Sequence, residues 1–173
     1  MNANTIIPRG IIGGKLAAVL EITVKTGDSI LVGYEKMKNL IAKALEVRKN
    51  AYAPYSNFYV GAVLLAASGK VYAGTNVENS SYPVGLCAER NAFAQAASNG
   101  ERKFEILVIA GGKSEENPDN LKNYCFPCGM CRQFISEFCT SDLTIVLAKS
   151  TDDYRVYKMP ELLPLAFDVN NLK

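Results

Sequence analysis

The chain of 173 residues contains no histidine and no tryptophan. Without histidine, catalytic triads of the Ser-His-Asp or Cys-His type are excluded, and so is any metal site with an imidazole ligand. A catalyst that works near neutral pH must then take its base from a carboxylate, a lysine or a metal-bound water. Any catalytic site in this chain therefore depends on these groups.

An excess of charge of one sign and long apolar runs are also missing. Nineteen Lys and Arg residues face seventeen Asp and Glu residues, a net charge of +2 that predicts no nucleic acid polymer as partner. No segment approaches the roughly 18 apolar residues of a membrane-spanning helix, and we expect no secretory leader. Five cysteines in such a chain indicate a reducing cytoplasm, where clustered thiols bind metal more often than they form disulfides.

From residue 34 onward, hydrophobic periodicity predicts helices that alternate with short strands. Helices are expected over residues 34–49 and 87–98, from Pro127 onward, and over 161–165; strands are expected over 60–66, 71–77, 106–110, 144–148 and 154–157. This alternation predicts an α/β fold, a three-layer α/β/α sandwich around a mixed sheet of about five strands. Residues 1–33 are expected to form an N-terminal extension of unknown role, and residues 34–173 the domain.

Three cysteines stand at the expected starts of two helices. Cys87 begins one of them, and Cys128 and Cys131 lie at the start of the other. Helix N-termini stabilise thiolates, and a spacing of three places both thiols of the second pair on one side of a helical turn. Three protein ligands with an open fourth position are typical of catalytic zinc, whereas structural zinc has four. The sequence therefore predicts a catalytic zinc site.

Glu89 gives this site a possible chemistry. It follows Cys87 by two residues, so its carboxylate can reach the open zinc position without being a ligand. There it can take a proton from a zinc-bound water and deliver it elsewhere. Zinc deaminases are built in this way: they allow three cysteine ligands and use a glutamate as proton shuttle.

Two other uses of the thiols stay open at this point. Cys125 lies three residues before Cys128, and with the three other cysteines it would close a non-catalytic four-cysteine structural zinc module. Alternatively, Cys128 and Cys131 have the spacing of a redox dithiol, which would leave Cys87 and Glu89 without a role. The remaining cysteine, Cys139, is expected to be a buried core thiol.

Further motifs, in the right order, make the chain resemble the small, oligomeric cytidine deaminases of pyrimidine salvage. The resemblance covers residues 40–173. It rests on AYAPYSNF at 51–58, VGA at 60–62, GTNVEN at 74–79, CAER at 87–90, PCGMCRQ at 127–133, ELLP at 161–164 and Phe167.

The resemblance implies an enzyme with one Zn²⁺ per subunit. It would convert cytidine and deoxycytidine to uridine and deoxyuridine, with release of ammonia. It would be cytoplasmic, bind no nucleic acid polymer or membrane, and form a homotetramer with shared active sites. Cys87, Cys128 and Cys131 would be the zinc ligands, and Glu89 the catalytic residue. Arg90 would donate to the thiolates and offset the formal charge of −1 that three of them leave on the zinc site.

The resemblance also assigns substrate contacts. Asn76 and Glu78 would hold the ribose 3′-hydroxyl, and Phe58 would flank the pyrimidine. The Ala88 backbone would read the base, and Phe167 would reach a neighbouring subunit's site. Ser80 and Tyr82 complete the expected set near the sugar.

Some positions depart from the usual pattern of the family. These are Ser80, Met130, Phe126 and a long loop over residues 112–126. Because they lie near the site, a deaminase of a nucleoside antibiotic such as blasticidin S is an alternative. The Phe58 segment and the pair Asn76 and Glu78 favour the plain nucleoside.

Overall fold

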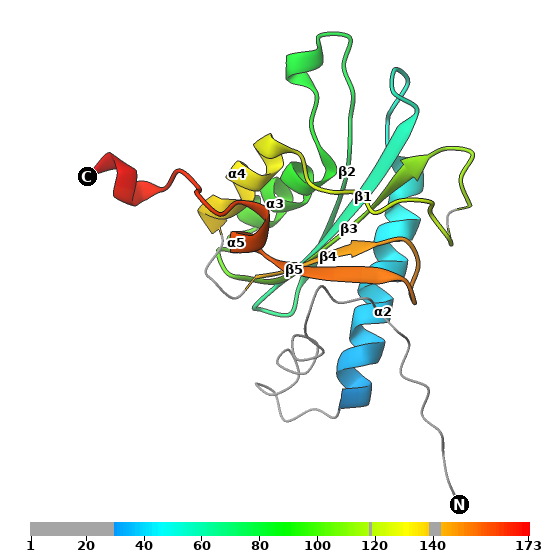
Figure 1. Ribbon diagram of the computed structural model, residues 1–173, viewed down its shortest axis with the longest axis horizontal. Coiled ribbons are helices and arrows are strands. Elements are labelled where there is room, and N and C mark those ends of the chain that lie inside the picture. Colours follow the sequence, from blue (N-terminus) through cyan, green and yellow to red (C-terminus); the bar gives the residue numbers. More distant parts are fainter. Residues whose placement is uncertain (1–29, 118, 139–142) are drawn as a thin grey trace, which may run out of the picture.

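The computed structural model describes residues 30–117, 119–138 and 143–173 (Figure 1). Its elements, in chain order, are α2 (Ile30–Val47), η1 (Arg48–Asn50), β1 (Phe58–Ala66), β2 (Val71–Thr75), η2 (Tyr82–Val84), α3 (Ala88–Ser98), β3 (Phe104–Lys113), α4 (Gly129–Phe138), β4 (Thr144–Ala148), β5 (Tyr154–Lys158), α5 (Met159–Leu162) and η3 (Val169–Leu172). Within the described part of the chain, no helix combines the length and apolar character needed to cross a membrane. The expected core thiol Cys139 and the first 29 residues of the expected extension lie outside the described residues.

The strands form one five-stranded sheet in the order β2-β1-β3-β4-β5. Strands β3 and β4 are parallel and the other neighbours antiparallel, which confirms the predicted mixed sheet. Because β2 and β3 are both antiparallel to β1, they run in the same direction. They therefore end at the same edge of the sheet, and the segments that follow them start there.

Alternating side chains of the strands build two cores, one on each face of the sheet. On one face, Leu64 and Leu107 pack with residues of α3, α4 and α5. On the other, Val63 and Val108 pack against α2. Helices thus cover both faces, as Figure 1 shows, and the predicted three-layer α/β/α sandwich is confirmed.

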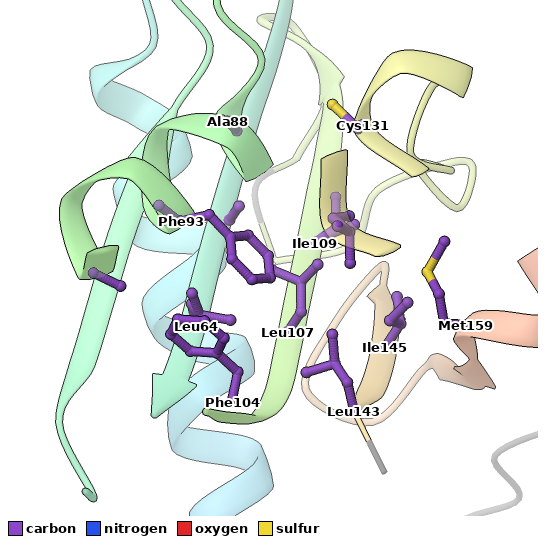
Figure 2. Close-up of a cluster of buried hydrophobic side chains, with 14 of the residues drawn as sticks. Leu64, Ala88, Phe93, Phe104, Leu107, Ile109, Cys131, Leu143, Ile145 and Met159 are labelled. Carbon is purple, nitrogen blue, oxygen red and sulfur yellow. The ribbon is translucent and has the colours of Figure 1, made fainter. Parts of the chain in front are cut away.

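An aromatic cluster joins α3 to α4. The Phe93 ring of α3 lies 5.4 Å from that of Phe138 and 6.3 Å from that of Phe134, both in α4, measured between centroids. Phe104 closes the cluster at 5.0 Å from Phe93. Figure 2 shows Phe93 and Phe104 in the core, with Ala88 and Cys131 at the end where α3 and α4 begin. The cluster therefore fixes how the two helix N-termini lie relative to each other.

Some predicted boundaries were wrong, for identifiable reasons. Helix α4 begins at Gly129 and not at Pro127, because Cys128 acts as its N-cap: its sulfur accepts from the Cys131 amide at 3.5 Å. Helix α5 begins at Met159 and ends at Leu162, earlier than expected, since the Glu161 carboxylate caps it by accepting from the Lys158 amide at 2.7 Å.

Strand lengths also differ from the prediction. Strand β3 continues to Lys113, beyond the expected end at residue 110. The pair Gly111 and Gly112 predicted a loop, but both residues pair with β1. Strand β2 ends at Thr75, two residues early. Helix α2 begins at Ile30, before the start expected near residue 34.

A substitution at Gly74 tests the contact between β2 and α3. A Cβ atom there would lie 2.5 Å from both the Ala88 carbonyl oxygen and the Ala92 nitrogen, so α3 would have to move. We expect Gly74→Ala to lower the free energy of unfolding by at least about 2 kcal/mol, measured by urea denaturation. Gly129→Ala is the matched control, because a Cβ there meets nothing within 4 Å. Equal stability of the two variants would contradict this packing.

Candidate active site

The sheet edge where β2 and β3 end brings the three predicted thiols together. Cys87 is the N-cap residue of α3, Cys128 directly precedes α4, and Cys131 lies in the first turn of α4. Their sulfur atoms all lie within 4.8 Å of one another, and those of Cys87 and Cys128 are 3.9 Å apart. Three sulfurs about 2.3 Å from one tetrahedral zinc ion would be about 3.8 Å apart. The donor set therefore fits a zinc ion in both chemistry and spacing.

The thiols differ in their protonation. A hydrogen bond from the Cys131 thiol lowers the pKa of Cys87 to about 5, aided by Arg90 and Cys128 and opposed by desolvation. The same bond raises the pKa of Cys131, which is fully buried. Cys87 is thus a thiolate at neutral pH, and binding of a metal would draw the proton from Cys131.

Arg90 lies beside this cluster. Its Nη2 donates to the Gly85 carbonyl at 2.9 Å and lies 3.9 Å from the Cys87 sulfur. Its Nε is buried and has no hydrogen-bond partner among the described residues. A guanidinium whose buried Nε is a spare donor suits a site that gains negative charge when three thiolates bind one divalent ion.

Glu89 lies in the first turn of α3 and is only 4% exposed. Burial raises the pKa of its carboxyl to about 7, and the negative charge of Cys87 acts in the same direction. A carboxyl that titrates near neutral pH can both accept and release a proton. This is the property that the sequence analysis required of a base in a chain without histidine.

A cavity of about 500 Å³ opens beside the thiols. Of the predicted site residues, six line it: Asn76, Glu78, Tyr82, Cys87, Arg90 and Cys128. Glu89 and Cys131 are buried next to these. The structure thus brings two of the expected zinc ligands and three of the expected sugar contacts to one cavity.

Four predicted substrate contacts do not line the cavity of the described chain: Phe58, Ser80, Ala88 and Phe167. Ala88 is fully buried. Phe58 is half-buried at the start of β1, and Ser80 is exposed in the loop after β2. Phe167 is 58% exposed, and Gln133 Nε2 donates to its carbonyl at 2.8 Å. Their roles stay predictions.

The role of Ser56 in the cavity wall was not predicted from the sequence. Ser56 lines it and holds the Glu78 carboxylate through its hydroxyl. The available signal was the Tyr55-Ser56-Asn57 segment, whose residue types favour a turn. Met130, which was expected near the site, lines the cavity as an exposed apolar side chain next to Cys131.

Cys125 lies outside the thiol cluster of the described residues. It packs against β3: a Cβ at Gly111 would lie 2.7 Å from its sulfur. Burial raises the pKa of Cys125 to about 12, so its thiol is protonated at neutral pH. This arrangement favours three ligands over the closed four-cysteine alternative.

The chain matches a known family over residues 34–147, the cytidine and deoxycytidylate deaminase zinc-binding region. A cytidine deaminase of Sporosarcina psychrophila is 41% identical over 136 residues, which cover 79% of this chain and 94% of that protein. A cytidine deaminase of Halalkalibacterium halodurans is 38% identical over 133 residues, which cover 77% of this chain and 95% of that protein. The crystal structure of cytidine deaminase from Burkholderia pseudomallei superposes with a TM-score of 0.66 at 41% identity, covering 75% of this chain and 97% of that one.

The matched region and the thiol cluster together define the class of zinc-binding deaminases. Within this class, the extent and identity of the matches decide the family: the chain belongs to the cytidine deaminases. The resemblance seen in the motifs is thereby confirmed.

A hydrogen bond of the loop that precedes Cys128 predicts how the stability of the protein depends on pH. Asp153 accepts from Lys149 Nζ at 2.6 Å and from the Tyr124 hydroxyl of this loop. The hydrogen bond from Lys149, and after it the one from Tyr124, lowers the pKa of Asp153. The Asp153 carboxylate therefore contributes its full stabilisation above the ordinary pKa of Asp. This stabilisation is lost as the pH falls through the lowered pKa of the folded protein. Asp153→Asn should cost about 1 kcal/mol at pH 7, mostly through Tyr124, because exposed ion pairs contribute little.

Urea denaturation of the unaltered protein and of Asp153→Asn between pH 7 and pH 2 measures the difference in their free energies of unfolding. This difference should become smaller below about pH 4. Asp119→Asn, in the same loop, controls for the loss of one negative charge. A difference that stays constant with pH would contradict the assignment.

Proposed function

We propose that the protein catalyses the hydrolytic deamination of cytidine and deoxycytidine to uridine and deoxyuridine with release of ammonia. One observation carries this proposal: three convergent thiols and the buried Glu89 meet at a cavity that also presents Asn76 and Glu78. The names of the relatives, cytidine deaminases at up to 41% identity, support the same reaction.

In this proposal Cys87, Cys128 and Cys131 hold one zinc ion and leave a fourth coordination position for water. When bound, zinc supplies Lewis acidity, which makes a coordinated water acidic near neutral pH. Arg90 offsets part of the charge of the thiolates, and Cys125 stays outside the ligand set.

Glu89 does the proton work of the reaction. It accepts a proton from the attacking water and delivers it to N3 of the cytosine while C4 is attacked. It then takes the proton of the new C4 hydroxyl, which becomes the uracil carbonyl, and passes it to the amino group that leaves from C4. One water is thus consumed and one ammonia released. A pKa of about 7 allows the same carboxyl to act as base and then as acid.

The sugar side of the cavity selects the substrate. Glu78 and Asn76 accept and donate hydrogen bonds at the 3′-hydroxyl, with Ser80 and Tyr82 nearby. Phe58 flanks the pyrimidine, and the Ala88 backbone reads it. Phe167 is exposed and contributes to the site of a neighbouring subunit in a homotetramer. The free thiols require a reducing compartment, and we place the enzyme in the cytoplasm.

A phosphorylated substrate is disfavoured by charge. Among the described residues that line the cavity, Arg90 is the one cation, and it is already engaged with Gly85 and Cys87. Glu78 is an anion on the same wall. A nucleoside therefore fits this cavity better than a nucleotide.

Glu89→Gln tests the catalytic assignment. The amide keeps the size of the side chain but cannot carry the proton, so we expect turnover to fall at least about 1,000-fold while zinc content stays near one per chain. The absorbance change on deamination is followed with cytidine, deoxycytidine and blasticidin S. Brisk turnover by the variant would overturn the role of Glu89. Activity of the unaltered enzyme on blasticidin S alone would favour the antibiotic deaminase, and zinc without any turnover a binding module.

The number of zinc ligands has its own test. Cys131→Ser should lose zinc, because a serine hydroxyl is a poor replacement for a thiolate. Cys125→Ser is the matched control and should keep about one zinc ion per chain, since this thiol lies outside the cluster. Zinc is counted by elemental analysis after gel filtration. Loss of zinc from both variants would support the four-cysteine site.

A further inference from the structure

Glu78 is the anion on the sugar side of the cavity, and both of its oxygens are held by one short segment. Oε2 accepts from the backbone amides of Tyr55 and Ser56 at 2.9 and 3.1 Å. Oε1 accepts from the Ser56 hydroxyl. These three donors fix the direction of the carboxylate. Oε1 accepts only one of these hydrogen bonds, so its second lone pair can accept from a further donor.

Ser56 does more than hold the carboxylate. Its hydroxyl donates to Glu78 and at the same time accepts from the Phe58 amide at 3.0 Å. The Ser56 carbonyl accepts from Lys113 Nζ at 2.8 Å, which ties the turn to the end of β3. Asn57 adopts a φ of 55°, in the left-handed region, so the chain can turn tightly between Ser56 and Phe58.

Asn76 holds the other side of Phe58. Its Nδ2 donates to the Phe58 carbonyl at 2.9 Å, and its Oδ1 accepts from the Val60 amide at 2.8 Å. Two polar side chains thus form hydrogen bonds with the backbone at the start of β1: Ser56 from the turn before it, and Asn76 from the residue after β2. Of these two, only Ser56 also contacts the Glu78 carboxylate.

We propose that Ser56 is a positioning residue for the sugar: its hydroxyl connects Phe58 to Glu78 and directs the free acceptor position of Glu78 toward a sugar hydroxyl in the cavity. This inference rests on the proposed function, because it assigns the nucleoside sugar to this side of the cavity. Ser56 acts through Glu78 and does not touch the reacting atoms. It sets how strongly the enzyme distinguishes a nucleoside with a 3′-hydroxyl from one without.

The test compares deoxycytidine with 2′,3′-dideoxycytidine, which lacks only the 3′-hydroxyl. Ser56→Ala should lower kcat/KM for deoxycytidine about tenfold, mainly through KM, because one charge-assisted hydrogen bond no longer orients Glu78. For the dideoxy compound the loss should stay below about twofold. Ser56→Thr keeps the hydroxyl and should restore the discrimination. In a Glu78→Gln background, Ser56→Ala should have little further effect.

Ser68→Ala is the matched control. The Ser68 hydroxyl donates to Glu101 at 2.7 Å and accepts from the Lys70 amide at 3.4 Å, the same pattern away from the cavity. This variant should lose comparable stability in urea denaturation without any change in discrimination. An equal loss for both substrates in Ser56→Ala, or a full loss in the Glu78→Gln background, would overturn the proposal.

Binding separates this inference from the proposed reaction. Dissociation constants of both nucleosides are measured by calorimetry in the Glu89→Gln protein, with and without Ser56→Ala. Absence of turnover in the unaltered enzyme would refute the proposed function. The binding ratio would still decide the role of Ser56: a roughly tenfold drop in discrimination supports it, and an unchanged ratio contradicts it.

Discussion

The whole site depends on the direction of two strands. Strands β2 and β3 both pair antiparallel with β1, so the segments after them start at one edge of the sheet. Helices α3 and α4 then pack through Phe93, Phe134 and Phe138, which fixes the relation between their first turns. Two thiols 41 residues apart in sequence thereby come within 3.9 Å, with no disulfide among the described cysteines. Packing of the core, and not a disulfide among these cysteines, brings the thiols together.

The absence of histidine shapes the electrostatics of this site. Three thiols bring more negative charge to a divalent ion than neutral imidazoles would, and the structure places Arg90 against them with a buried Nε still free of partners among the described residues. Burial raises the pKa of Glu89 to about 7, and the negative charge of Cys87 acts in the same direction. The chain thus obtains a group that titrates near neutral pH, the usual role of histidine, from a carboxylate.

The sequence was sufficient for the features that repeat or that sit at helix starts. Alternation of apolar residues predicted the sheet and its two covered faces, and the spacing of Cys87, Cys128 and Cys131 predicted the cluster. Boundaries were missed where a side chain caps a helix in an unusual way, as Cys128 does for α4. The hold of Ser56 on Glu78 was missed because it joins residues 22 apart through a turn, and no local pattern specifies such a contact.

The two sides of the cavity are stabilised by different physical means. On the metal side, Cys131 and Glu89 are buried and are fixed by packing of α3 on α4, so a change there affects the core. On the sugar side, Ser56 is exposed and Glu78 only half-buried, and hydrogen bonds of a short turn hold them. Exposed turns open at lower free energy than packed helices do. Under the proposed function, we therefore expect substitutions around Ser56 to alter which nucleoside is accepted while the thiols and Glu89 stay in place. Substitutions around Phe93 would instead disturb the packing that positions those groups.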